Sequence, residues 1–172
     1  MTCLSLIVSA ALATPVPFSG VSNIATLDTP IGAELADLDG DGTLDLIVMA
    51  FGTPGLSVYL NSNDDFANLD SPLTEGSTGY VDVAIGDLDK SGELDFVTTN
   101  YGSDEIVWWQ RYGATFTPIL VTSEFDGPDD VEVADLDRDG DLDIVAVGSD
   151  ANEVAWWENR LDSPVPDTSD TG

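Results

Sequence analysis

The sequence predicts an all-β fold, a β-propeller-type array of three four-stranded antiparallel blades with an N-terminal closing strand. A nine-residue acidic loop occurs three times, and the copies begin 50 and 48 residues apart, a period typical of propellers and similar arrays. Short runs rich in β-branched and aromatic residues precede and follow each copy, separated by Gly, Asp, Asn and Ser. Short strands joined by such turns are typical of antiparallel blades.

The acidic loops occupy residues 37–45, 87–95 and 135–143. Crowded carboxylates repel one another unless a cation lies among them, and oxygen ligands at alternate positions around a turn suit Ca²⁺. Position 6 is always glycine, where the chain must turn sharply. Positions 1, 3, 5 and 9 offer side-chain oxygens, and position 7, where the side chain varies, is expected to offer its carbonyl. The candidate ligands are Asp37, Asp39, Asp41, Thr43, Asp45, Asp87, Asp89, Ser91, Glu93, Asp95, Asp135, Asp137, Asp139, Asp141 and Asp143.

The EF-hand shares the first half of this loop but requires Glu at position 12 and lies between helices. Position 12 is Val48, Thr98 or Ala146 here, and strand-like runs follow each loop, which excludes the EF-hand. In the middle loop Ser91 replaces a carboxylate and Lys90 lies beside it. Because fewer ligand charges weaken Ca²⁺ binding, this loop is expected to be the weakest of the three sites.

Each unit is expected to contain four strands in the same order. The first precedes the acidic loop and the second follows it. The third carries an aromatic residue 14 positions after the Asp at loop position 9, which we call the closing Asp. The fourth follows a Phe 21 positions after that Asp in the first two units. The predicted strands are Ile31–Ala36, Leu44–Ala50, Leu56–Asn61 and Phe66–Leu69, then Tyr80–Gly86, Leu94–Thr99, Glu105–Gln110 and Phe116–Val121, then Asp129–Ala134, Leu142–Val147 and Glu153–Glu158.

The third unit has no fourth strand of its own, because Pro, Ser, Thr and Asp dominate the sequence that follows it. A matching strand is found at the N-terminus, where Phe18 lies 19 residues before Asp37, as Phe116 lies 19 residues before Asp135. A strand over Phe18–Ile24 is therefore expected to complete the last blade. Closure within one chain, closure by dimerisation and membership of a longer propeller are the alternatives.

The pattern Ala-Asp-Leu-Asp-Gly-Asp-Gly-x-Leu-Asp, with Val-Trp-Trp-Gln or Ala-Trp-Trp-Glu-Asn further on, resembles the FG-GAP/VCBS repeat family over residues 18–160. It is similar to the calcium-binding blades of integrin α-subunit propellers. The resemblance implies three Ca²⁺ ions, each bound by side chains at loop positions 1, 3, 5 and 9 and by the carbonyl at position 7. The chain departs from the family in blade number, since family propellers commonly have about seven blades.

Composition excludes several functions. Acidic residues number 33 against four basic ones, which gives a net charge of −29. Such a surface repels phosphate backbones and anionic lipids, so no nucleic-acid partner is expected. The chain has no His, which excludes Ser-His-Asp and Cys-His catalysis and His-ligated zinc, and no enzymatic activity is expected. Cys3 is the only Cys, so no intrachain disulfide can form.

The two ends differ in composition from the repeats. Residues 1–13 form an apolar run ending in Ala-Leu-Ala, which indicates a signal peptide and is too short to span a membrane. The repeat domain is assigned to residues 14–160. Residues 161–172, rich in Pro, Ser, Thr and Asp, are expected to be a disordered tail. A secreted protein, extracellular or at the cell surface, is predicted.

The leading interpretation is an extracellular calcium-binding module that acts in adhesion, protein interaction or assembly and whose Ca²⁺ is structural. Its partner is expected to be an unidentified protein or glycan. Self-association is an alternative to a monomer. A lectin-like propeller is the second interpretation, and an accessory domain of a secreted enzyme the third. The pairs Trp108/Trp109 and Trp156/Trp157 could stack on sugar rings. Neighbours in a strand face opposite ways, however, and adjoining blades cover both faces, so core packing is the favoured interpretation.

Overall fold

The computed structural model describes residues 22–62, 65–68, 73 and 78–161. Within these residues the chain forms eleven β-strands and no helix. The strands are β1 (Pro30–Ala36), β2 (Asp45–Ala50), β3 (Leu56–Ser62), β4 (Asp65–Asn68), β5 (Tyr80–Gly86), β6 (Asp95–Asn100), β7 (Glu105–Tyr112), β8 (Thr115–Thr122), β9 (Pro128–Ala134), β10 (Asp143–Gly148) and β11 (Glu153–Trp157).

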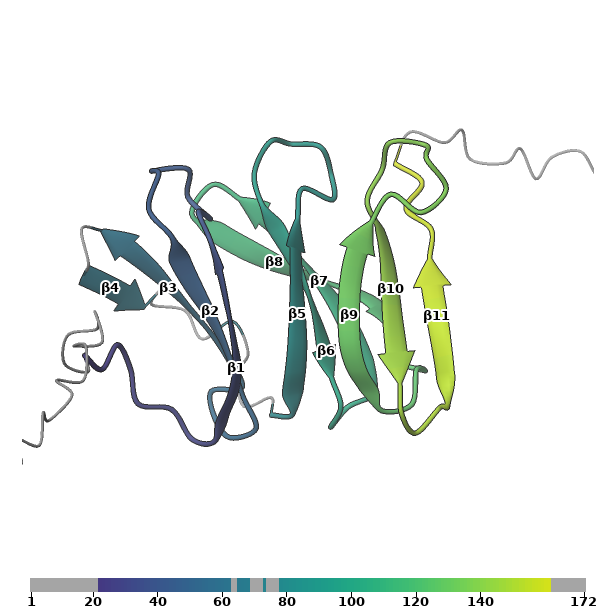
Figure 1. The fold of residues 1–172 in the computed structure, drawn as a ribbon, viewed down its shortest axis with the longest axis horizontal. Helices are drawn as coiled ribbons and strands as arrows, with labels where there is room; N and C mark the ends of the chain where they lie inside the picture. The colour runs from purple at the N-terminus through teal and green to yellow at the C-terminus, as the bar shows by residue number, and fades with distance from the viewer. Residues whose placement is uncertain (1–21, 63–64, 69–72, 74–77, 162–172) are drawn as a thin grey trace, which may run out of the picture.

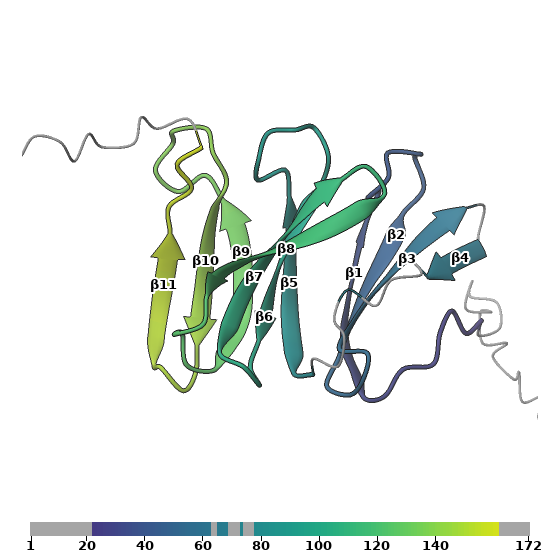
Figure 2. The ribbon, with the colours of Figure 1, turned by 180° about the vertical axis from the view of Figure 1, so that it is seen from behind.

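The strands form three antiparallel sheets, one for each predicted unit (Figure 1). Their strand orders are β1-β2-β3-β4, β5-β6-β7-β8 and β9-β10-β11. The sheets stand side by side, as the reverse view also shows (Figure 2), and β5 contacts both β1 and β9. All three acidic loops project from the same end of the array (Figure 1). The predicted all-β fold of three antiparallel sheets is therefore confirmed. Two sheets have the predicted four strands, whereas the third has three among the described residues, and the described sheets form an open array and not a closed ring.

Strand pairing repeats in register with the sequence. The residue two positions after the closing Asp is Ile47, Val97 or Val145 in the three units, and it lies opposite Val58, Trp108 or Trp156 on the next strand. The first strand of each sheet also has a register shift near the end remote from the acidic loop. The sequence repeat is thus a repeat of hydrogen-bonded structure.

Two apolar clusters hold the sheets together. Because successive side chains of a strand point to opposite faces, Phe96 of β6 faces the first sheet and Val97 faces the third. The first cluster includes Leu38, Ile47, Met49, Leu56, Val58, Phe96, Val107 and Trp109. The second includes Leu88, Val97, Ile106, Phe125, Val131, Ile144 and Ala146. The middle sheet is therefore buried on both faces, as a blade between two others must be.

The Trp residues follow this pattern with one exception. Trp109 is buried, stacks on Phe96 with ring centroids 5.8 Å apart, and donates its indole N–H to Thr98 Oγ1 at 2.9 Å. Trp157 packs edge-on against Phe125 at 5.3 Å. Trp156 is 49% exposed. The core interpretation is thus wrong for Trp156, because no described part of the chain covers that face of the third sheet.

The N-terminal closing strand is not found where it was predicted. Ser22–Ile24, the described part of the predicted strand, is irregular. It lines a hollow of about 230 Å³ together with Leu46 and Val48 of the first sheet, at the opposite end of the array from β11 (Figure 1). The prediction that this segment completes the third sheet of its own chain is therefore wrong for Ser22–Ile24. The rest of the predicted strand, the signal peptide over residues 1–13, and residues 162–172 of the tail lie outside the described residues.

Candidate metal centres

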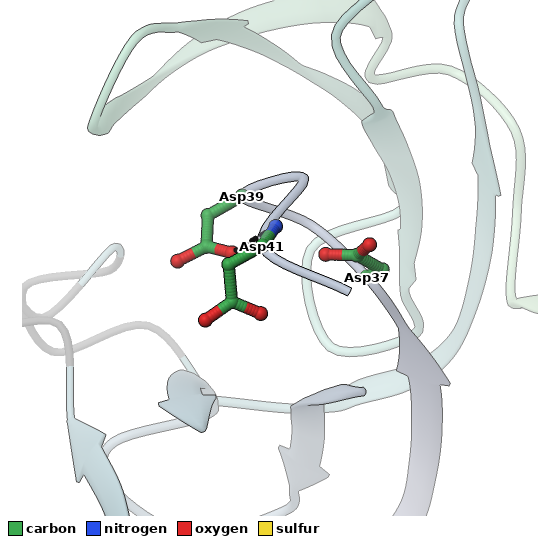
Figure 3. A group of neighbouring side chains, drawn as sticks. All are labelled: Asp37, Asp39 and Asp41. Carbon is green, nitrogen blue, oxygen red and sulfur yellow. Dashed lines mark hydrogen bonds between the residues drawn. The ribbon is translucent and has the colours of Figure 1, made fainter. Parts of the chain in front are cut away.

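Each acidic loop brings carboxylates together at the end of the first strand of its sheet. One oxygen from each of Asp37, Asp39 and Asp41 lies within 4.8 Å of the others, and all three side chains come from one turn of the chain (Figure 3). The corresponding groups in the other loops are Asp87, Asp89 and Asp95, and Asp135, Asp137 and Asp143. The structure thus brings together most of the predicted side-chain ligands in all three loops.

The loop backbone folds around its own carboxylates. In the first loop, Asp41 N donates to Asp39 Oδ1 at 3.1 Å, and Gly42 N donates to Asp37 Oδ2 at 2.9 Å. Thr43 N and its hydroxyl both donate to Asp41 Oδ1, which lowers the pKa of the Asp41 carboxyl. The second and third loops repeat the position 6 to position 1 bond at 2.9 and 3.2 Å. The backbone of each loop is therefore folded around its position 1 carboxylate.

Left-handed backbone supports this turn at two positions. Gly42, Gly92 and Gly140 at position 6 have φ of 91°, 86° and 95°, as the sequence predicted from glycine's freedom. Position 4 also has positive φ, and there Lys90 and Arg138 adopt values of 58° and 68° that side chains disfavour. The strain at position 4 was not anticipated.

The closing Asp of each loop ties three segments together. Asp45, Asp95 and Asp143 are fully buried. In the first loop, Asp45 Oδ2 accepts from Leu38 N at 2.7 Å and its Oδ1 accepts from Asn61 N on β3 at 2.8 Å. The other two loops make equivalent bonds. Burial raises the pKa of Asp95 against these bonds. Position 9 therefore has a structural role whatever else it binds.

Two of the three position 1 carboxylates give the clearest indication that these loops suit a cation. Asp37 Oδ1 and Asp87 Oδ1 are buried and have no hydrogen-bond donor in the described structure. A charged oxygen without a donor or cation is costly to bury. Both residues belong to the carboxylate clusters described above. The residues present therefore fit a hard cation such as Ca²⁺, which takes six to eight oxygens.

Two residues next to the loops were missed by the sequence reasoning. They lie 15 positions after the closing Asp, on the third strand or directly after it. Gln110 donates to Asp89 Oδ2 at 2.7 Å, and Glu158 forms an acidic group with Asp137 and Asp139. Burial, together with the charges of Asp139, Asp143 and Glu158, raises the pKa of Asp137. The sequence signal that could have identified Gln110 and Glu158 was that each lies 15 positions after the closing Asp of its unit.

The second and third loops are joined directly. Lys90 Nζ forms an ion pair with Asp141, whose side chain is 1% exposed. Asn159 Nδ2 donates to the carbonyls of both Leu88 and Leu142, at 2.8 and 3.1 Å. Position 7 was expected to offer only its carbonyl, but the Asp141 side chain has this separate role between the sheets.

Comparison with known proteins places these loops in a family. No curated protein matches the sequence. A solved structure of an Agrocybe aegerita lectin, described for its specific recognition of non-reducing terminal N-acetylglucosamine, is 22% identical with a TM-score of 0.44. The match covers 76% of this chain but only 38% of the lectin chain, so this chain spans less than half of that protein's length.

No helix among the described residues is long and apolar enough to cross a membrane.

The family model for the FG-GAP-like repeat matches residues 37–98 and 87–146. Each range begins at the first Asp of one acidic loop and extends through the next acidic loop into the strand that follows it. The ranges therefore coincide with the repeat of loops and sheets described above. The chain belongs to the FG-GAP-like repeat family.

Proposed function

We propose that this chain is a non-catalytic, extracellular calcium-binding module that acts in protein interaction or adhesion and whose Ca²⁺ ions are structural. The observation that carries the proposal is the pair of buried, unpartnered oxygens on Asp37 and Asp87, each inside a carboxylate cluster that recurs in every unit. A cation at each loop would offset the repulsion among carboxylates that the fold holds close together.

Ca²⁺ supplies positive charge and flexible oxygen coordination, which suits acidic loops of this length. The residues expected to hold it are the side chains at positions 1, 3 and 5 and the carbonyl at position 7, with the closing Asp shared between the ion and the backbone. The apolar N-terminal run favours secretion, and extracellular Ca²⁺ would keep such sites loaded.

Calorimetric titration of the metal-free chain with Ca²⁺ tests the proposal. We expect three ions per chain, two bound more tightly and one more weakly, with the weak ion in the loop that contains Ser91. Asp37→Asn should remove or weaken one tight ion and leave the others. Ser123→Asn, an exposed substitution directly after the end of β8 that pairs with the start of β7, away from the acidic loops, is the control. Absence of heat in the wild type, or unchanged titration of Asp37→Asn, would contradict the proposal.

Carbohydrate binding is the second candidate, and the exposure of Trp156 is the observation that favours it, since aromatic rings stack on sugars. A glycan array probed with calcium-loaded protein separates the two candidates. Binding to a defined glycan that is lost in chelator and in Trp156→Ala would establish the second candidate. No binding to any glycan leaves the protein-interaction module.

A further inference from the structure

The third sheet has an apolar face on the side away from the second sheet. Leu136, Val147, Val154 and Trp156 lie on this side, and all four are exposed. We call this surface the terminal face. Figure 1 shows β9, β10 and β11 at the end of the array, with no described strand beyond them. An apolar surface left open in this way marks an interaction site.

The same repeat positions are interior in the other two sheets. Leu136 is 47% exposed, whereas its equivalents Leu38 and Leu88 are 3% and 2% exposed. Val154 is 71% exposed, whereas its equivalents Leu56 and Ile106 are both 0% exposed. In the first two sheets, the next sheet along the chain covers these positions. The terminal face is therefore the half of a repeated interface whose other half is not supplied by the described chain.

The covering half has a defined chemistry. In the second junction, Leu142 at loop position 8 meets Leu88 at loop position 2 of the preceding sheet. A Cβ placed on Gly86 would lie 2.7 Å from Leu142 Cδ1 and 3.8 Å from Leu88 Cδ1, so both leucines close on the same spot. Ile144 and Trp157 complete the covering surface. We call the side of a sheet that corresponds to the Leu142, Ile144 and Trp157 side of the third sheet its leading side. The occupant that fits the terminal face is thus the leading side of a further FG-GAP-like sheet.

We propose that the terminal face binds the first sheet of a second copy of this chain, head to tail. The first sheet is the only described sheet whose leading side meets no other sheet. Its loop leucine, Leu44, is 55% exposed, whereas the equivalent Leu94 and Leu142 are half-buried. Val48 and Tyr59 on that side are already buried, and Ser22–Leu27 lies over Leu46 and Val48, so docking must displace this segment.

Charge supports the same pairing. Lys90 at position 4 of the second loop pairs with Asp141 of the following loop. Arg138 holds position 4 in the third loop and is exposed. In the head-to-tail arrangement, Arg138 faces the acidic loop at residues 37–45 of the second copy, where Thr43 takes the place of Asp141 and the nearby carboxylates supply the negative charge. Docking at both ends gives a ring of about six blades, within the usual range of about four to eight, while docking at one end permits longer assemblies.

Sedimentation velocity in calcium over a range of protein concentrations tests the proposal, which does not depend on the metal assignment. Wild-type mass should rise with concentration from 18.1 kDa toward at least twice that value. Val154→Asp places a charge on the terminal face and should stay at 18.1 kDa. Tyr112→Asp, at an 82% exposed aromatic position outside that face, is the matched control and should associate like the wild type.

A wild type that stays at 18.1 kDa throughout would overturn the proposal, and would mean that the terminal face is covered within the chain or left open. Equal association of Val154→Asp and wild type would also overturn it.

Cysteine cross-linking tests the orientation. In a Cys3→Ser background, chains carrying Leu44→Cys and chains carrying Leu136→Cys are mixed and oxidised. Head-to-tail docking predicts a disulfide between the two different chains. Cross-linking of Leu136→Cys chains with each other would show that two terminal faces meet and would overturn the proposal, as would the absence of any cross-link. Circular dichroism of each variant checks that it is folded.

Discussion

The two junctions between the sheets are built differently, although the acidic loops beside them are repeats. Apolar packing dominates the first junction, with Leu38, Met49 and Leu56 on one side and Phe96 and Trp109 on the other. The second junction also contains polar links. They are the Lys90–Asp141 ion pair and hydrogen bonds from Asn159 Nδ2 to Leu88 O, Tyr101 Oη to Asp150 Oδ2, Val131 N to Asp82 Oδ2 and Gly127 N to Asp104 Oδ1.

Loop residues that vary between repeats account for part of this difference. Position 4 of the first loop is Gly40, which has no side chain to reach the second loop. Glu93 at position 7 of the second loop is instead 3.7 Å from Arg111 Nε of its own sheet. At the next junction, Lys90 and Asp141 occupy the same two positions and pair across the sheets. Side chains that are not expected metal ligands, at positions 4 and 7, can therefore determine how neighbouring blades are joined.

The largest effect is expected at the first junction. Phe96→Ala removes a fully buried ring that packs between Trp109 and Phe116, and should lower the free energy of unfolding by about 3–5 kcal/mol. Urea unfolding in calcium measures this loss. Tyr112→Ala, at a largely exposed position, is the control and should change stability by less than about 0.5 kcal/mol. A loss below about 1 kcal/mol for Phe96→Ala would mean that this junction is not the main apolar core.

An intermediate effect is expected at the second junction. Lys90→Gln leaves the buried Asp141 carboxylate without its cation, and should lower the free energy of unfolding by about 1–3 kcal/mol. Adding Asp141→Asn should recover part of that loss, because the buried charge is then removed. In the Val154→Asp background, which should stay monomeric, Arg138→Gln at the same position of the third loop is the matched control, because no described sheet follows that loop. If the two substitutions at position 4 lower stability equally, the cross-sheet pair contributes nothing.

The smallest effect concerns Asp82, also at the second junction. Burial, and then the nearby charge of Asp130, raise the pKa of Asp82 above its usual value. The folded state therefore binds this proton more tightly than the unfolded state does, so the contribution is present at low pH and is lost as pH rises through the folded pKa. Asp82→Asn keeps an acceptor for Val131 N and should raise stability at neutral pH by less than about 1 kcal/mol, because solvent screens this half-buried group.

Denaturant unfolding at several pH values checks the Asp82 prediction. The difference between Asp82→Asn and wild type should shrink as pH falls. A variant that is less stable than wild type at neutral pH would show that the carboxylate of Asp82 stabilises the junction through its hydrogen bond.

The loops and strands could be predicted from sequence because their signals are local and repeated. Asp, Gly and Leu recur at fixed loop positions, and the strands pair through alternating residues within one unit. The order of carboxylates predicted the clusters for the same reason. The paired roles of Lys90 and Asp141 could not be predicted, since they depend on the distance between two sheets, which no single repeat determines.

The prediction of the N-terminal closing strand was wrong for a related reason. The match of Phe18 to Phe116 predicts a strand-like segment, but it does not say which sheet receives it. Ser22–Leu27 lies at the first sheet, which is adjacent in sequence and offers apolar residues of its own. Contact with the third sheet would require the chain to cross the whole array, and loop closure over a longer segment carries a larger entropic cost.

The most direct test of calcium as the structural element is the melting temperature in Ca²⁺ and in chelator, with Mg²⁺ as the comparison ion. Each ion bound only to the folded state adds about 2.7 kcal/mol at a hundredfold excess over its Kd. The melting temperature should therefore rise strongly in Ca²⁺, and much less in Mg²⁺, which demands a stricter octahedral geometry. Superimposable melting curves in Ca²⁺ and chelator would contradict the account.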